Sequence, residues 1–122
     1  MKILIADDEL RLRKVVVLHL KKQGFIVAEA NNGKKALEII DDFNPDIIIL
    51  DVMMPEKDGI DTCREIRKNE KFKDTPIILL TAKSGEDDID TGLKAGANEY
   101  ITKPFSPKLL IQKINGLIDK EV

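Results

Sequence analysis

Short apolar runs alternate with longer amphipathic segments along the whole chain. Uninterrupted aliphatic runs that are bounded by turn residues are typical of strands buried on both faces of a parallel sheet. We therefore predict strands at residues 2–6, 25–30, 47–50, 76–81 and 99–102. The most apolar of these runs, Ile47 to Leu50, leads directly into Asp51. Because a carboxylate contributes nothing to apolar packing, we expect Asp51 to lie where the sheet opens to solvent or to an ion.

Helical periodicity fills the segments between these runs. Residues 10–22 place apolar residues at helical spacing among basic ones, and Gly24 supplies a stop signal. The predicted helices cover residues 10–22, 34–42, 59–69 and 86–95, and a fifth begins at Pro107 after a Ser106 N-cap. Gly92 falls inside the fourth helix, where glycine costs about 1 kcal/mol relative to alanine. We therefore expect that helix to be only marginally stable.

Five strand–helix units, with no repeat and no linker, predict an α/β fold. We expect a five-stranded, doubly wound, all-parallel sheet with helices on both faces. Right-handed crossovers favour the flavodoxin-like (βα)5 strand order 2-1-3-4-5, which binds its ligand at the switch point between the first and third strands. At 122 residues, we expect residues 1–122 to form one domain.

Composition restricts the possible functions. The chain is 43% hydrophobic and 34% charged, which is typical of a globular domain. A net charge of -2 gives no reason to expect direct binding to nucleic acid or to a membrane surface. The sequence has no signal-peptide pattern and no apolar run approaching ~18 residues, so we expect a cytoplasmic protein. The single cysteine, Cys63, rules out an intrachain disulfide, and its helical spacing from Ile60 and Ile66 indicates packing.

Polar side chains stand where neighbouring strands end. Asp7 and Asp8 follow the first strand, Asp51 follows the third, Thr81 ends the fourth and Lys103 follows the fifth. Since the carboxyl ends of parallel strands share one edge, three carboxylates converge there and must either shift their pKa values or hold a cation. Oxygen ligands suit Mg²⁺. With the lysine and the hydroxyl beside the ion, this edge predicts a receptor for a phosphoryl group and one carboxylate left as nucleophile.

This arrangement resembles a known family. The residues that carry the resemblance are Asp7-Asp8, Asp51 with Pro55 and Gly59, Thr81-Ala82, and Lys103-Pro104-Phe105. Their order and spacing are similar to those of the receiver domains of two-component response regulators, over essentially the whole chain. The resemblance implies that the protein takes a phosphoryl group from a sensor histidine kinase, or a histidine phosphotransfer protein, and signals to a downstream effector domain or protein.

The resemblance also implies a role for each residue of the edge. Asp51 is the phosphoacceptor. The ligands implied for Mg²⁺ are Asp8, Asp51 and the Met53 backbone carbonyl, assisted by Asp7. The groups implied to bind the phosphoryl oxygens are Thr81, the backbone of Ala82, and Lys103. Thr81 and Tyr100 form the implied switch, and the bond between Lys103 and Pro104 is expected to be a cis peptide bond.

Two surfaces are expected to bind partners. The first predicted helix carries surplus apolar residues, Val17 and Leu18, which by analogy with the family would dock the kinase. The face made by the fourth helix, fifth strand and fifth helix is the implied output face. On it, a phosphorylation-dependent homodimer would use Glu99 with Lys113 as a charge pair and Leu93 with Ile111 as an apolar patch. Ile89 and Leu109, however, stand where a further charged pair is expected.

Several alternatives compete with the phosphoacceptor. A receiver-like binding module that does not use phosphate remains open. A phosphohydrolase would need a second acid just after the nucleophile, and Val52-Met53 offers none, so we expect a phosphoacceptor that assists its own phosphorylation and dephosphorylation rather than an enzyme. No glycine-rich loop follows the first strand, which argues against a nucleotide site.

Two other side-chain groups have simpler interpretations. Asp7, Asp8 and Glu9 also suit the start of the first helix, and we expect one of them to serve as its N-cap. His19 is the only histidine, and it lies on that helix far from the strand ends. We therefore do not expect it to relay phosphate.

Overall fold

The computed structural model describes residues 1–82 and 86–120. Five parallel strands form one sheet in the order β2-β1-β3-β4-β5, as the sequence predicts. The strands are β1 (Lys2–Ala6), β2 (Ile26–Ala30), β3 (Ile47–Asp51), β4 (Ile77–Thr81) and β5 (Glu99–Thr102). The first and third strands are therefore neighbours, and the switch point of the sheet lies between them.

The helices follow the predicted pattern to within one residue at the ends that were predicted. They are α1 (Leu10–Lys22), α2 (Gly33–Phe43), α3 (Gly59–Lys68), α4 (Glu86–Lys94) and α5 (Pro107–Lys120). A short 3-10 helix, η1 (Glu70–Phe72), follows α3 and was not predicted. Its N-cap is Asn69, whose side chain accepts a hydrogen bond from the Lys71 N–H.

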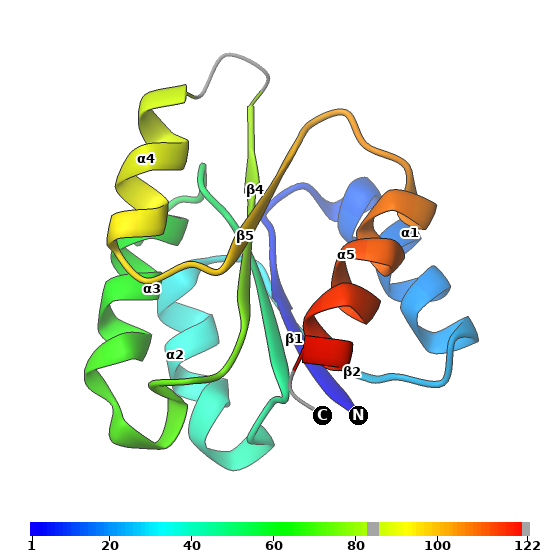
Figure 1. The fold of residues 1–122 in the computed structure, drawn as a ribbon, viewed down its shortest axis with the longest axis horizontal. Coiled ribbons are helices and arrows are strands. Elements are labelled where there is room, and N and C mark those ends of the chain that lie inside the picture. Colours follow the sequence, from blue (N-terminus) through cyan, green and yellow to red (C-terminus); the bar gives the residue numbers. More distant parts are fainter. Residues whose placement is uncertain (83–85, 121–122) are drawn as a thin grey trace.

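The sheet separates two apolar cores. Figure 1 shows α2, α3 and α4 on one side of the strands and α1 and α5 on the other. Alternate residues of a strand enter opposite cores: Ile48 and Leu50 pack with α2 and α3, whereas Ile47 and Ile49 pack with α1 and α5. Both faces of β3 are therefore buried, which explains why its sequence is apolar without interruption.

Helix α1 corrects one expectation about its surface. Val17 was expected to be exposed for docking, but only 5% of it is accessible, while Leu18 is 53% exposed. The other exposed apolar side chains of this helix are Leu10 and Val15. Because α1 packs against α5 as well as against the sheet, its buried stripe is wide enough to include Val17.

The N-terminus of α1 confirms the expected position of the N-cap residue but shows no capping by its side chain. Glu9 is the N-cap residue, but its side chain makes no capping hydrogen bond. The Asp7 carboxylate does not cap the helix either, and instead accepts a hydrogen bond from the Glu9 N–H at 2.9 Å. At the other end of the chain, the Ser106 hydroxyl accepts a hydrogen bond from the Leu109 N–H, as its position before Pro107 predicts.

Candidate functional site

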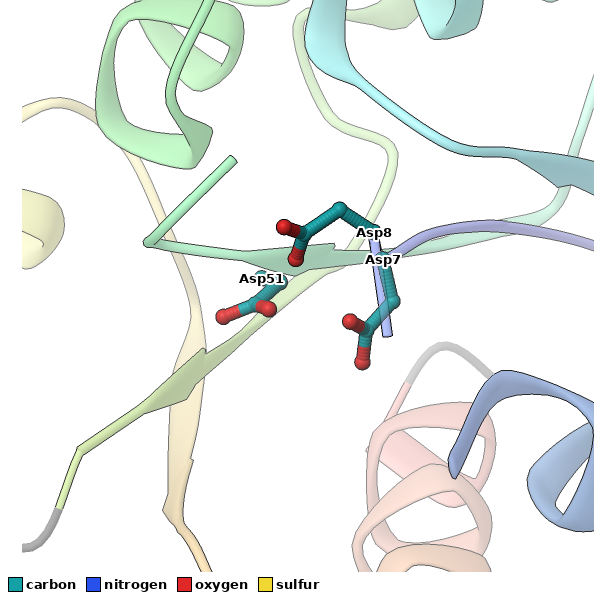
Figure 2. A group of neighbouring side chains, drawn as sticks. All are labelled: Asp7, Asp8 and Asp51. Carbon is teal, nitrogen blue, oxygen red and sulfur yellow. The ribbon is translucent and has the colours of Figure 1, made fainter. Parts of the chain in front are cut away.

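The carboxylates of Asp7, Asp8 and Asp51 meet at the carboxyl edge of the sheet. Asp7 and Asp8 directly follow β1, and Asp51 is the last residue of the neighbouring β3. One carboxylate oxygen from each lies within 4.8 Å of the others. Figure 2 shows the three side chains next to one another. Asp7 and Asp51 are buried, whereas Asp8 is exposed. The cluster therefore sits at the surface with one acid facing solvent.

Lys103 brings a single positive charge to these acids. Its Nζ lies 2.9 Å from Asp51 Oδ2, 3.6 Å from Asp7 Oδ2 and 3.8 Å from Glu9 Oε2. Burial lowers the pKa of Lys103, but the hydrogen bond to Asp51 and the surrounding negative charges outweigh burial and raise it. The lysine therefore stays charged. The peptide bond between Lys103 and Pro104 is cis.

The surroundings of Asp51 disfavour the ionised form of its carboxylate. Burial, together with the neighbouring Asp7, raises the pKa of Asp51 to about 6, and the hydrogen bond from Lys103 opposes this rise. Like charges that share a site favour a protonated carboxyl group. Because the raised value still lies below 7, the Asp51 side chain is mainly ionised at neutral pH.

One oxygen of this cluster has no hydrogen bond. Among the described residues, Asp7 Oδ2 is the only buried side-chain oxygen or nitrogen without a hydrogen-bond partner. A buried and unsatisfied carboxylate oxygen in an acidic cluster is a natural ligand for a cation. The donor set is made of hard oxygens, which fits Mg²⁺ rather than a soft metal.

Gly59 allows the loop after β3 to fold closely over Asp51. A Cβ atom at position 59 would overlap the Asp51 carbonyl oxygen and its neighbours. The Gly59 N–H donates a hydrogen bond to the Val52 carbonyl oxygen at 3.0 Å. The glycine therefore holds the loop that carries Met53, whose N–H lies 3.3 Å from Asp51 Oδ1.

The remaining site residues lie on β4 and β5. Thr81 is buried at the end of β4, and among the described residues its hydroxyl makes one long hydrogen bond, of 3.4 Å, to the Ala82 carbonyl oxygen. Tyr100 is 36% exposed, so it is not part of either core. Within the described residues, the hydroxyl of Thr81 is therefore only weakly held, and part of the Tyr100 side chain faces solvent.

A pocket of about 400 Å³ opens beside Asp51. Its lining combines the charged groups of the site with apolar side chains, and consists of Glu9, Leu12, Asp51, Met53, Ala82, Lys103, Pro104 and Phe105. The pocket connects the Asp51 carboxylate to solvent beside α1.

The structure also shows the contacts or burial of other residues that the sequence analysis singled out. Lys113 Nζ and Glu99 Oε1 lie 3.1 Å apart within the same chain, so the expected charge pair is already formed inside one molecule. His19 Nδ1 lies 2.9 Å from the Val15 carbonyl oxygen on its own helix. Cys63 is fully buried, and burial raises the pKa of its thiol, which agrees with packing.

Arg13 is a contributor that sequence reasoning missed. Its Nη1 donates a hydrogen bond to the main-chain carbonyl oxygen of Asp7 at 2.6 Å. In the sequence, Arg13 is one of several basic residues on the polar side of the first helix, and nothing distinguishes it from Arg11 or Lys14. Only the fold brings it next to the acidic cluster.

Across residues 1–82 and 86–120, none of the helices combines the length and the apolar character that crossing a membrane requires.

Comparison with known proteins matches nearly the whole chain to one family. The family model of the response regulator receiver domain matches residues 3–115. A probable transcriptional regulator, ycf27, of Guillardia theta is 44% identical over 117 residues, and the transcriptional regulatory protein ResD of Bacillus subtilis is 43% identical over 117 residues. Both alignments cover 96% of this chain but only 45% and 48% of the relatives. The chain thus spans about half the length of these curated relatives.

Solved structures give the same result. A putative response regulator from Chloroflexus aurantiacus superposes with a TM-score of 0.92 at 34% identity, covering 97% of each chain. The receiver domain of the Francisella response regulator 1452 has a TM-score of 0.89 at 36% identity, covering 99% of this chain and 98% of the other. The chemotaxis response regulator CheY4 of Vibrio cholerae has a TM-score of 0.88 at 32% identity, covering 93% and 95%.

Proposed function

This chain belongs to the response regulator receiver domains of two-component signalling, and on this premise we propose that Asp51 accepts a phosphoryl group from a phosphohistidine. The observation that carries the proposal is the setting of one carboxylate. Asp51 ends a buried strand, opens into a pocket, and lies beside two further acids and 2.9 Å from Lys103. The donor is a sensor histidine kinase or a histidine phosphotransfer protein, and residues 1–122 act as one receiver domain.

The transfer is an in-line displacement. An Asp51 carboxylate oxygen attacks the phosphorus atom, the bond from phosphorus to the imidazole nitrogen breaks, and that nitrogen keeps the electron pair. Lys103 then exchanges its hydrogen bond to Asp51 for the transferred phosphoryl oxygens, and the Thr81 hydroxyl and the Ala82 N–H donate to them. Because the domain is itself modified, it acts as a phosphoacceptor that assists its own phosphorylation and dephosphorylation, not as an enzyme with a separate substrate.

Mg²⁺ is the proposed cofactor. Asp7, Asp8, Asp51 and the Met53 carbonyl would hold it, and the unsatisfied Asp7 Oδ2 supports this assignment. When bound, the ion would neutralise negative charge on the transferring phosphoryl group. Removal of Mg²⁺ with EDTA is therefore expected to abolish phosphorylation.

The transferred group supplies the energy for switching. Each charge-assisted hydrogen bond to it contributes about 1.5–3 kcal/mol, so bonds from Thr81 and Lys103 together can make a minor conformation the major one. Inward movement of Thr81 would free space for Tyr100 and change the face made by α4, β5 and α5. This output face acts on an effector domain or protein, and the relatives named as transcriptional regulators support an output in transcription.

The same face supports a phosphorylation-dependent homodimer. Of the expected apolar patch, Leu93 on α4 is exposed, whereas Ile111 on α5 is partly buried and packs against the core beneath α1 and α5. Leu109, which stands where a charged residue is expected, is also exposed. Glu99 and Lys113 already pair within the chain, so they would contribute to a dimer only if they exchange partners.

The exposed apolar side chains of α1 support kinase docking. Leu10, Val15 and Leu18 are exposed on this helix, and Leu12 of the same helix lines the pocket beside Asp51. Replacing Leu18 with glutamate is expected to slow transfer from the kinase, while transfer from a small phosphodonor stays unchanged. Equal slowing by both routes would count against docking.

The proposed function is tested by intact-protein mass after incubation with Mg²⁺ and phosphoramidate. A single added phosphate is expected for the wild type, and none for Asp51→Asn or for the wild type with EDTA. An adduct that persists in Asp51→Asn would move the acceptor to another residue. The absence of any adduct, from phosphoramidate and from a histidine kinase alike, would favour a receiver-like binding module that does not use phosphate.

A further inference from the structure

Arg13 joins the acidic cluster to the neighbouring edge strand. From α1, its Nη1 donates to the Asp7 carbonyl oxygen at 2.6 Å, and its Nε donates to Glu29 Oε1 at 3.0 Å. Glu29 lies on β2 at the edge of the sheet. The Arg13 side chain is only 12% exposed, so this double contact is largely shielded from water. A single guanidinium therefore connects three segments: α1, β2 and the turn that carries Asp7.

The other polar groups of Asp7 are also held. Its N–H donates to the Ala30 carbonyl oxygen on β2 at 3.1 Å, and its Oδ1 accepts from the Glu9 N–H at 2.9 Å. Only Oδ2 is left without a hydrogen bond, and it is buried among the site carboxylates. The contacts that fix Asp7 therefore leave Oδ2 with no hydrogen bond and only an ion pair, to Lys103 Nζ at 3.6 Å, and Arg13 supplies one of those contacts.

Glu29 anchors Arg13 through its charge. Burial raises the pKa of Glu29, but the hydrogen bonds from Arg13 and Lys14 outweigh burial and lower it below its usual value, so Glu29 is ionised at neutral pH. Lys14 Nζ lies 3.3 Å from Glu29 Oε2 but forms no hydrogen bond to Asp7 in the described structure. Lys14 therefore shares the ion pair without sharing the contact to the site.

We propose that the Arg13–Glu29 pair is a positioning device for the magnesium site. Arg13 holds the main chain of Asp7 so that its carboxylate stays in the acidic cluster, and Glu29 holds Arg13. Outer-shell partners of metal ligands typically change metal affinity by about 10- to 100-fold when they are removed. The inference rests on the proposed function, because it assumes that the acidic cluster binds Mg²⁺.

The test measures Mg²⁺ affinity directly, by isothermal titration calorimetry with MgCl2 alone. Arg13→Met keeps a long side chain and removes both hydrogen bonds, and it is expected to weaken Mg²⁺ binding about tenfold. Glu29→Gln is expected to weaken it less, because Arg13 keeps its bond to Asp7. Lys14→Met is the matched control, since it removes an ion pair to Glu29 but no contact to Asp7, and it is expected to stay within about twofold of the wild type.

A second readout separates positioning from general stability. With phosphoramidate, the Mg²⁺ concentration for half-maximal phosphorylation of Arg13→Met is expected to rise by the same factor as the dissociation constant. The rate at saturating Mg²⁺ is expected to stay near that of the wild type. Arg13→Lys keeps the charge but has no planar fork to reach Glu29 and Asp7 together, so an intermediate affinity is expected.

Equal Mg²⁺ affinity for Arg13→Met, Lys14→Met and wild type would overturn the inference and leave the proposed function intact. If Arg13→Met does not fold, the Mg²⁺ affinities of Glu29→Gln and Lys14→Met are compared instead. Equal affinities for these two variants and the wild type would overturn the inference. A wild type that binds no Mg²⁺ and forms no adduct would overturn the proposed function and, with it, this inference.

Discussion

At the residue scale, the fold makes the ionised form of the Asp51 carboxylate less favourable than it is in water. Its pKa is raised to about 6 by burial first and by Asp7 second, against the opposing effect of Lys103. An aspartate in the unfolded chain has a pKa of about 3.9. The folded state therefore binds this proton more tightly than the unfolded state. It follows that the contribution of Asp51 to stability is greatest below about pH 4 and is lost as the pH rises through about 6.

The first prediction follows from this loss of stability with rising pH. In EDTA, Asp51→Asn is expected to be more stable than the wild type at about pH 7.5, by roughly 2 kcal/mol, and to differ little from it at about pH 4. Urea unfolding of both proteins across this pH range measures the difference. Adding Mg²⁺ at neutral pH is expected to stabilise the wild type and not the variant. A variant that is less stable at every pH would contradict the raised pKa.

Glu56 is a second residue under local strain. It adopts a positive φ of 69°, in the loop between β3 and α3 that passes over Asp51. A residue with a Cβ atom pays roughly 1–2 kcal/mol in this left-handed region, whereas glycine does not. The sequence pattern does not predict a positive φ at Glu56, because the path of the loop between β3 and α3 sets this backbone angle.

The second prediction concerns this strain. Glu56→Gly is expected to raise the free energy of unfolding by about 0.5–1 kcal/mol, because relief of the left-handed strain exceeds the extra entropy of glycine in the unfolded chain. Thermal unfolding measures the change. Glu56→Ala is the control, since it removes the carboxylate but keeps a Cβ atom. An equal gain from alanine would assign the effect to the charge and not to the backbone.

At the scale of elements, α4 shows a conflict between propensity and packing. The sequence suggests that Gly92 weakens the helix, since glycine is a poor helix former. In the structure, Gly92 is buried, and a Cβ atom there would overlap the side chain of Leu79 on β4. The glycine therefore lets α4 lie close to the sheet. The low helix propensity of α4 at Gly92 is therefore a consequence of the close packing of this helix on β4.

The third prediction distinguishes the two effects. Gly92→Ala is expected to destabilise the protein by about 1 kcal/mol net, because overpacking against buried Leu79 costs more than helix propensity returns. Gly116→Ala on α5 is the matched control, because no atom lies within 4 Å of a Cβ atom there and the position is exposed. This control is expected to stabilise by about 0.5–1 kcal/mol. Urea unfolding of both variants provides the test, and a stabilising Gly92→Ala would show that propensity dominates.

At the scale of the whole molecule, Arg67 ties distant segments together. From α3, its guanidinium donates to the carbonyl oxygens of Phe72, Thr75 and Gly96 and to the side chain of Asn98. Asn98 Oδ1 also accepts from the Ile77 N–H at the start of β4. Burial lowers the pKa of Arg67, with Cys63 and Asp74 opposing, but an arginine remains charged. This network anchors the C-terminal end of α4 to α3 and to the sheet.

The fourth prediction follows from this network. Arg67→Ala is expected to destabilise the protein by about 2–4 kcal/mol, because several half-buried carbonyl groups lose a charged donor. Urea unfolding measures the loss. Arg64→Ala is the control, since Arg64 makes one exposed ion pair with Asp61, and a change of less than about 0.5 kcal/mol is expected. Equal effects of both variants would mean that the network contributes little.

The positions of the five strands and five α-helices, and the sheet edge where the acidic cluster lies, could be predicted from the sequence pattern. Strands buried on both faces need uninterrupted apolar runs, so their positions could be predicted from Ile47 to Leu50 and its counterparts. Parallel strands share one carboxyl edge, so residues at the strand ends, such as Asp8, Asp51 and Lys103, were expected to gather without knowledge of any contact. These features depend on hydrophobic periodicity and on the order of strands and helices along the chain. Both can be read directly from the sequence.

Features that depend on the neighbours of a side chain could be seen only in the folded chain. The burial of Val17 required α5 to lie beside α1, and the use of Gly92 required Leu79 to lie beneath it. Likewise, Arg13 and Arg67 look like ordinary basic residues of helix surfaces until the fold brings carbonyl groups to their guanidinium groups. Such contacts join residues far apart in the chain, and local periodicity carries no information about which residues meet.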